Sequence, residues 1–241
     1  MGHDHHAQSY LETCMVSSSL SVSSKSEGDT IFPFRISLKA PILLKSMFGY
    51  KGTDAVEGIA VDVSKIRELQ LSPDIFKKMP NIRLLKLYAP LNERSCNVHL
   101  PIGLESFSHK LRCLEWNGYP SMTLPVETFC PENLVMLCMP HSRVKKLWDG
   151  AQDLVNLKEI DLYGSRQLME LPDLSKASKL EILNVSHCVN LYHVHPSIMS
   201  LSKIVDLILY GCKNLKTLHA RAIKNLFVNG CLNLKEFSLA S

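Results

Sequence analysis

The sequence lacks the short motifs that carry common catalytic and metal-binding chemistry. It has no CxxC or HxxxH pair with zinc spacing, and no G-x-x-x-x-G-K-[ST] loop to cradle a nucleotide phosphate. Its 8 cysteines in 241 residues are too sparse for a disulfide scaffold. These absences predict no cofactor and no metal site, and they argue against an enzyme.

Targeting signals and extreme charge are also missing. The opening residues, MGHDHHAQSYLETCMVSSSL, lack the basic start and continuous apolar core of a secretory signal, so we expect a cytoplasmic or nuclear protein with free thiols. The apolar stretch 31–48 is interrupted by prolines and basic residues and is not a membrane span. The net charge is only +4 without a Lys/Arg run, which predicts neither nucleic-acid nor membrane binding.

From about Gly52 the sequence repeats itself. An L-x-x-L-x-L pattern recurs eight times, at Val56/Ile59/Val61, Ile82/Leu85/Leu87, Leu111/Leu114/Trp116, Leu134/Leu137/Met139, Leu157/Ile160/Leu162, Leu180/Leu183/Val185, Ile204/Leu207/Leu209 and Ile223/Leu226/Val228. Successive first positions are 26, 29, 23, 23, 23, 24 and 19 residues apart, whereas leucine-rich repeats run to about 20 to 29 residues. The period indicates that type of repeat.

The pattern predicts one short strand per repeat, with alternate side chains on opposite faces. A single such strand cannot bury its apolar face, but parallel strands stacked repeat on repeat share a continuous core. We therefore expect an α/β leucine-rich-repeat solenoid, a horseshoe of about eight repeats with a parallel sheet on its concave face, over residues 52–241. The Ser-rich segment 1–51 shows no repeat and is predicted to be a disordered leader.

Five small polar residues occupy one register, three residues past the last strand position of their repeats: Ser142, Ser165, Cys188, Cys212 and Cys231. This is the Asn/Cys position of the repeat template. The chain turns inward there, and the buried backbone groups of the turn need hydrogen-bond partners. Because serine and cysteine alternate, we interpret these cysteines as structural rather than reactive or metal-binding.

The stretch NLVMLCMPHSRVKKLWDG, from Asn133, resembles the leucine-rich-repeat region of plant intracellular immune receptors of the TIR-type nucleotide-binding class (TIR-NB-LRR disease resistance proteins). Family-like phrases also occur in GTDAVEGIAVDVSKI, FKKMPNIRLLKLY, LRCLEWNGYP, PDLS and HPSI. The resemblance covers about residues 52–241. The chain shows neither the TIR nor the NB-ARC domain of that class, so a truncated receptor is expected, with the apolar edge at its last repeat uncovered.

The resemblance implies a non-enzymatic protein-interaction module for plant defense. Such a module recognises a pathogen effector or a guarded host protein and contributes to autoinhibition of the receptor. Its partners would be proteins: an effector, a host protein or a full-length receptor. Two alternatives remain open, a substrate adaptor for ubiquitin ligation and a non-functional receptor fragment.

If the solenoid binds a partner, its concave sheet is the expected surface. The predicted outward positions are Lys86, Tyr88, Glu115, Asn117, Met136, Glu159, Asp161, Tyr163, Asn184, Asp206, Tyr210 and Asn225. Acidic residues across the middle and tyrosines beside them could anchor a basic partner. A merely solvated sheet face is the competing interpretation.

Two further features were weighed as functional. Trp116 and Trp148 are residue types that dominate interfaces, but their repeat positions predict a core role. His187 beside Cys188 resembles half of a hydrolase's nucleophile pair. Neighbouring side chains in a strand or turn point apart, and no orienting acid is evident, so we expect no such chemistry.

Overall fold

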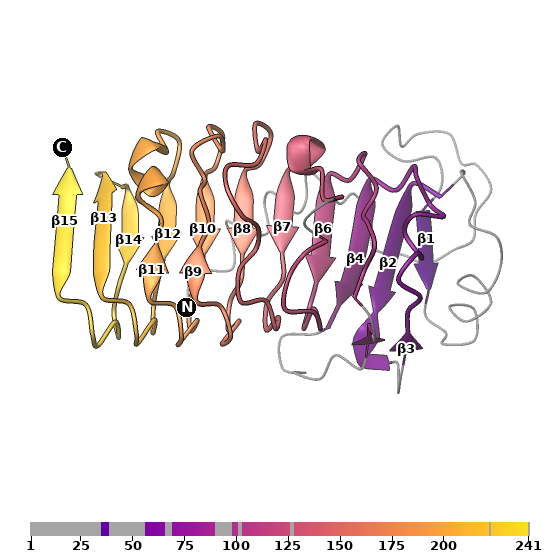
Figure 1. Cartoon of the computed structure of the whole chain (residues 1–241), viewed down its shortest axis with the longest axis horizontal. Helices are drawn as coiled ribbons and strands as arrows, with labels where there is room; N and C mark the ends of the chain where they lie inside the picture. Colours follow the sequence, from indigo (N-terminus) through magenta and orange to yellow (C-terminus); the bar gives the residue numbers. More distant parts are fainter. Residues whose placement is uncertain are drawn as a thin grey trace. The chain divides into compact units, whose positions relative to one another are not determined.

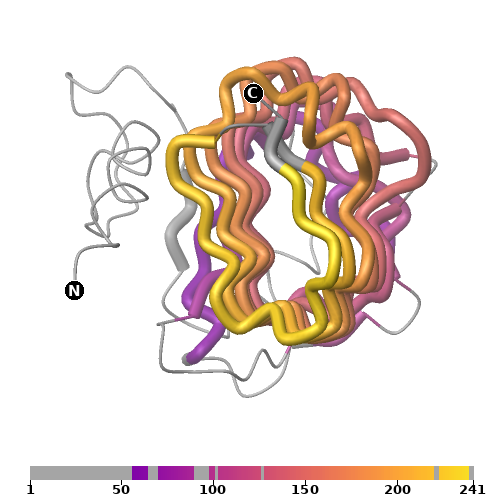
Figure 2. The backbone as a smooth tube through the Cα atoms, turned by 90° about the vertical axis from the view of Figure 1, so that its left-hand side faces the viewer, coloured from indigo at the N-terminus to yellow at the C-terminus, as the bar shows by residue number. Residues whose placement is uncertain are grey.

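A computed structural model describes residues 35–38, 56–65, 69–89, 98–100, 103–125, 128–221 and 223–240. The chain divides into two compact units, Met1–Thr30 and Ile31–Ser241. The first unit lies wholly outside the described residues. Within the second, the chain winds into successive coils that stack side by side (Figure 1). Seen along the stack, the coils lie almost one over another as a closed loop (Figure 2).

One long side of the stack is a nine-stranded sheet in which every neighbouring pair is parallel. In spatial order its strands are β1 (Arg35–Leu38), β2 (Gly58–Asp62), β4 (Leu84–Tyr88), β6 (Cys113–Trp116), β7 (Met136–Cys138), β8 (Glu159–Asp161), β10 (Ile182–Asn184), β12 (Asp206–Ile208) and β14 (Asn225–Phe227). Eight of these are the strands predicted from the repeat. Their central leucines pair in one register, as in Leu114 with Leu137 and Leu183 with Leu207. The predicted solenoid is confirmed.

The sheet begins earlier than the repeat pattern indicated. Arg35–Leu38 falls in the segment predicted to be a disordered leader, yet it forms β1 and pairs with β2. In this register Ile36 matches Ile59 and Leu38 matches Val61, so the short alternating sequence continues the repeat by one strand. Residues 35–38 thus form a strand within the segment that the sequence predicts to be a leader. The other residues of segment 1–51 lie outside the described residues.

The opposite side of the stack contains short two-stranded parallel sheets, and 3-10 helices occur in the connections between the two sides. The sheets pair β3 (Leu69–Gln70) with β5 (Val98–His99), β9 (Glu170–Leu171) with β11 (His193–Val194), and β13 (Thr217–Arg221) with β15 (Glu236–Ala240). The helices are η1 (Val63–Lys65), η2 (Pro131–Asn133) and η3 (Pro196–Ser200). No α-helix occurs in the described ranges, so the expected α/β class is realised with little helix. None of the helices found there is long and apolar enough to cross a bilayer.

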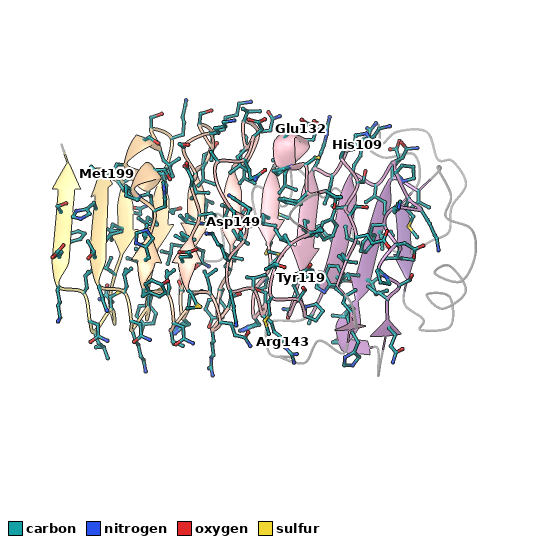
Figure 3. The ribbon with its side chains drawn as sticks, viewed as in Figure 1. His109, Tyr119, Glu132, Arg143, Asp149 and Met199 are labelled. Atoms are coloured by element: carbon teal, nitrogen blue, oxygen red, sulfur yellow. The ribbon has the colours of Figure 1, made fainter. Side chains whose placement is uncertain are left out.

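The core lies between the two sides and is built from the repeat leucines. Trp116 and Trp148 are 0% and 2% exposed, which confirms their packing role. Trp116 meets Phe76 and Tyr119 edge to face, with ring centroids 6.1 and 5.1 Å apart. Aromatic rings thus pack together in the core of the N-terminal half, whose repeats are the longest in sequence. Tyr119 lies where the chain turns after β6 (Figure 3).

The serine and cysteine register forms a hydrogen-bond ladder at these turns. Ser165 Oγ donates to the Met139 carbonyl at 3.1 Å and lies 2.8 Å from Ser142 Oγ. The thiols continue the series toward the carbonyls of the preceding repeats: Cys188 to Leu162, Cys212 to Val185 and Cys231 to Leu209, at 3.2, 3.1 and 3.2 Å. Ser165 and the three cysteines thus each satisfy a carbonyl of the previous coil, and Ser142 joins the ladder through the Ser165 hydroxyl. The structural interpretation of these cysteines is confirmed.

Candidate functional site

The outer face of the nine-stranded sheet, here called the sheet face, carries the side chains that point away from the core. The strand register aligns them in rows across the strands. One row runs Lys86, Glu115, Cys138, Asp161, Asn184; a second runs Cys113, Met136, Glu159, Ile182, Asp206, Asn225. A third set, Tyr88, Asn117, Tyr163 and Tyr210, lies just at or beyond the strand ends. The alternation of each strand therefore brings the predicted positions onto one face.

Lys86 and Glu115 form an ion pair on this face. The Nζ atom of Lys86 lies 2.9 Å from Oε2 of Glu115, and their side chains are 3% and 22% exposed. Burial is the largest single influence and lowers the pKa of Lys86, but the charge and hydrogen bond of Glu115, together with smaller contributions from Cys113 and Cys138, outweigh it, and the pKa of Lys86 is raised. The lysine is thus held in its charged form away from water.

Glu159 and Asp161, on β8, are half-buried and have raised pKa values. Burial is the largest cause for both, and Glu115 adds repulsion to each. The pKa of Glu159 rises to about 7, with Asp161 as a further cause, and the pKa of Asp161 rises to about 6. Asp161 still accepts a hydrogen bond from the Tyr163 amide at 2.7 Å. Among the described residues no ion pair involves either carboxylate.

These pKa values predict a stability that falls as pH rises. Between about pH 4 and 7 these two carboxyls keep protons in the folded protein that they have released in the unfolded chain. Each carboxyl therefore stabilises the fold fully below its unfolded pKa, and this stabilisation is lost as the pH rises through its folded pKa. From pH 5 to pH 8 the wild type should lose about 2 kcal/mol more unfolding free energy than Glu159→Gln/Asp161→Asn. Urea denaturation at both pH values measures this difference. Equal losses in the two proteins would contradict it.

An alternating ladder of histidine and tyrosine rings borders the acidic rows. His141, Tyr163, His187 and Tyr210 contact one another in order, edge to face, with centroids 5.3, 5.4 and 5.0 Å apart. Backbone hydrogen bonds align the ladder, because the amides of His141 and His187 donate to the carbonyls of Tyr163 and Tyr210. Tyr163 and Tyr210 are 40% and 48% exposed, so the ladder offers aromatic surface to a partner.

The sequence predicted the two tyrosines and missed the two histidines. Each histidine occupies the residue just before the serine or cysteine of the turn, where other repeats have Gly164, Gly211 or Gly230. Both histidines have a φ of 58°, in the left-handed region that glycine favours. Histidine is one of the residue types enriched there. The sequence does contain a signal for the two histidines: when the turns of the repeats are aligned, histidine replaces glycine at this position.

The remaining predicted residues differ in exposure. Three of the outward positions are buried rather than exposed: Lys86, Asn117 and Met136, at 3%, 8% and 5%. Strands about 4.8 Å apart allow larger neighbours to cover a side chain even on the outer face. Tyr88 is 38% exposed, while Asn184, Asp206 and Asn225 are half-buried. Asn225 Nδ2 donates to Asp206 Oδ1 at 2.6 Å, and Asn184 Oδ1 accepts from the Ser186 hydroxyl at 2.7 Å.

The Cys188 thiol beside His187 is not arranged as a nucleophile. Burial raises the pKa of Cys188 far above its ordinary value, and its Sγ is directed at the Leu162 carbonyl. The His187 ring instead packs between Tyr163 and Tyr210. Burial also raises the pKa of Cys212, to about 12, and that of Cys138. In the described ranges no group of three or more His, Cys, Asp or Glu residues is arranged to hold a metal ion.

Comparison with known proteins finds plant disease resistance proteins that are similar to this chain. The chain is 39% identical over 189 residues to disease resistance protein RPP2A, and 40% identical over 192 residues to disease resistance protein RPS6, both of Arabidopsis thaliana. Each match covers 77% of this chain but only 14% and 17% of the relative, so the chain spans less than a fifth of their length. No family model matches it. On this similarity and this fold, the chain resembles the leucine-rich-repeat region of plant disease resistance proteins of the TIR-type nucleotide-binding class.

Proposed function

We propose that the chain is a non-enzymatic recognition module of a plant intracellular immune receptor. It binds a pathogen effector or a guarded host protein through the sheet face, and it contributes to autoinhibition when that partner is absent. The cytoplasm or the nucleus is its place of action. The observation that carries the proposal is the sheet face itself, where exposed tyrosines adjoin carboxylates that no ion pair of the described residues neutralises.

Physical chemistry supports an interaction role for this face. Tyrosine presents a large, rigid contact area at low entropic cost and is enriched among the residues that dominate binding energy. The charged residues in rows beside the tyrosines orient a bound partner and discriminate between partners. Packing or hydrogen bonds occupy the core leucines, the buried tryptophans and the serine and cysteine side chains at the turns. Tyr163 and Tyr210, in contrast, remain partly exposed to solvent. The surface available for recognition is thus distinct from the residues that hold the fold.

The test is a pairwise binding screen of the full chain against pathogen effectors and host defense proteins. A partner of the sheet face should bind the wild type and lose at least about tenfold in affinity to Tyr163→Ala/Tyr210→Ala, because two aromatic anchors are removed. Tyr192→Ala is the matched control. Tyr192 is 43% exposed but adjoins β11 on the opposite side of the coil. Equal losses in both variants, or partners unaffected by the double variant, would refute the proposed face.

A further inference from the structure

The acidic part of the sheet face has carboxylates on two strands and no positive charge on the strand between them. We call Glu115, Cys138, Glu159 and Asp161 the acidic strip. Cys138, on β7, pairs in register with Glu115 on one side and Asp161 on the other. Those two carboxyl-bearing residues are therefore about 10 Å apart, two strand spacings. The outward residues of β7 are Met136 and Cys138, so nothing on that strand offsets the negative charge.

The same face already shows how it accommodates a cation. Lys86 approaches Glu115 from the β4 side, is 3% exposed and keeps its charge. On the other side of Glu115, toward β8, the described residues supply no equivalent cation. The raised pKa values of Glu159 and Asp161 reflect this imbalance, with burial first and neighbouring carboxylates second. Glu159 and Asp161 are thus left without a paired cation in the described part of the chain, although Asp161 accepts hydrogen bonds from the Tyr163 amide and the Asn184 side chain.

A buried amide near the strip independently indicates a missing donor. Asn117 lies two residues beyond Glu115, on the same face by strand alternation, and is 8% exposed. Its Oδ1 atom has no hydrogen-bond partner among the described residues. An unsatisfied buried acceptor costs about 1–3 kcal/mol, so a donor from a bound partner would be favourable there.

The neighbouring ring ladder indicates which chemical group would supply that donor. Tyr163 follows Asp161 by two residues, and an aromatic ring beside carboxylates suits a guanidinium group, which pairs with carboxylates and stacks on rings. A net charge of +4 means that the molecule as a whole does not attract cations. Any preference for a cation must therefore come from this local arrangement.

We propose that the acidic strip, together with Asn117 and Tyr163, binds an arginine side chain in a cationic segment of the partner protein. This inference rests on the proposed function and names the chemistry of its partner. The guanidinium donates to Glu159 and Asp161, which lie two residues apart on β8, and a second donor of the same segment reaches Asn117 beyond the end of β6. Bringing a cation to these carboxylates favours their ionised form, so binding releases protons near neutral pH.

The probe is a fluorescein-labelled hexa-arginine peptide titrated against the full chain at pH 6.5 and physiological salt. We expect Glu159→Gln/Asp161→Asn to weaken binding at least about tenfold and Asn117→Ala about threefold. The control, Asp149→Asn/Asp153→Asn, removes the same number of carboxyl groups from side chains that are 75% and 65% exposed in the segment between β7 and β8, and should change affinity less than about twofold. Calorimetry in two buffers of different ionisation enthalpy should show proton release for the wild type.

Three outcomes overturn the proposal: absence of hexa-arginine binding, equal affinity of wild type and Glu159→Gln/Asp161→Asn, and equal weakening by the control pair. Hexa-glutamate binding at the same face would also refute it. Urea curves at pH 6.5 verify that each variant is folded. Failure here is separable from failure of the proposed function, because a partner without arginine could still depend on Tyr163 and Tyr210 in the effector screen.

Discussion

Replacing Glu115 by glutamine should lower the free energy of unfolding by about 3 kcal/mol. The Lys86 side chain is 3% exposed, and Glu115 Oε2 lies 2.9 Å from its ammonium. Glutamine keeps the shape of the side chain but removes the charge that offsets the burial of Lys86. The cost is largely that of a buried, uncompensated ammonium, reduced because the Glu159 and Asp161 carboxylates remain on the same face. Urea denaturation at pH 7 measures the loss.

An exposed ion pair of the same chain is the matched control. Lys77 and Glu105 lie 3.5 Å apart with side chains 70% and 51% exposed, so Glu105→Gln should cost less than about 1 kcal/mol. Removing both charges, as in Lys86→Met/Glu115→Gln, should recover most of the stability lost in Glu115→Gln, because no buried charge is then left alone. A loss in Glu115→Gln no larger than in Glu105→Gln would show that burial does not govern this pair.

The strands and their register could be predicted because the leucine pattern is set by the coil itself. An apolar residue at each inward position is the condition for stacking coils, so the period is visible from Val56 to Val228. Cys188 and Cys212 could be assigned to the turn for a similar reason, since serine replaces cysteine at that register. Arg35–Leu38 was missed because four residues, in an apolar stretch interrupted by prolines and basic residues, carry too little periodicity to reveal a repeat.

The sequence predicted which positions lie on the sheet face, but it did not predict the charge interactions between them. Strand alternation places Lys86 outward, and a lysine at an outward position would ordinarily be solvated. Whether it is buried depends on Glu115, which is 29 residues away in sequence and adjacent only through strand pairing. The same holds for Glu159, whose pKa depends on neighbours from two strands. Pairwise charge effects across strands cannot be obtained from one-strand periodicity.

Gly164→Ala should destabilise the protein by about 2–3 kcal/mol and disturb the ring ladder. Gly164 has a φ of +66°, where a Cβ atom alone costs about 1–2 kcal/mol. A Cβ built there would also lie 2.5 Å from Nδ1 and 2.7 Å from Cε1 of His141, so the imidazole must move. That ring is one of those packed on Tyr163, at a centroid distance of 5.3 Å. Thermal unfolding and tyrosine ring resonances in NMR spectra measure the two effects.

Gly150→Ala separates backbone strain from ring displacement. Gly150 has nearly the same φ, +65°, but a Cβ there would meet nothing within 4 Å, so only the backbone cost of about 1 kcal/mol is expected. If Gly164→Ala and Gly150→Ala lose equal stability, the His141 ring moves aside freely and the ladder is loose. If Gly164→Ala costs more, and His141→Ala removes the excess in the double variant, the glycine at this turn is required because the preceding repeat carries histidine. The ring ladder would then be a rigid part of the sheet face. Its rigidity would depend on glycine at one turn making room for the histidine ring of the preceding turn.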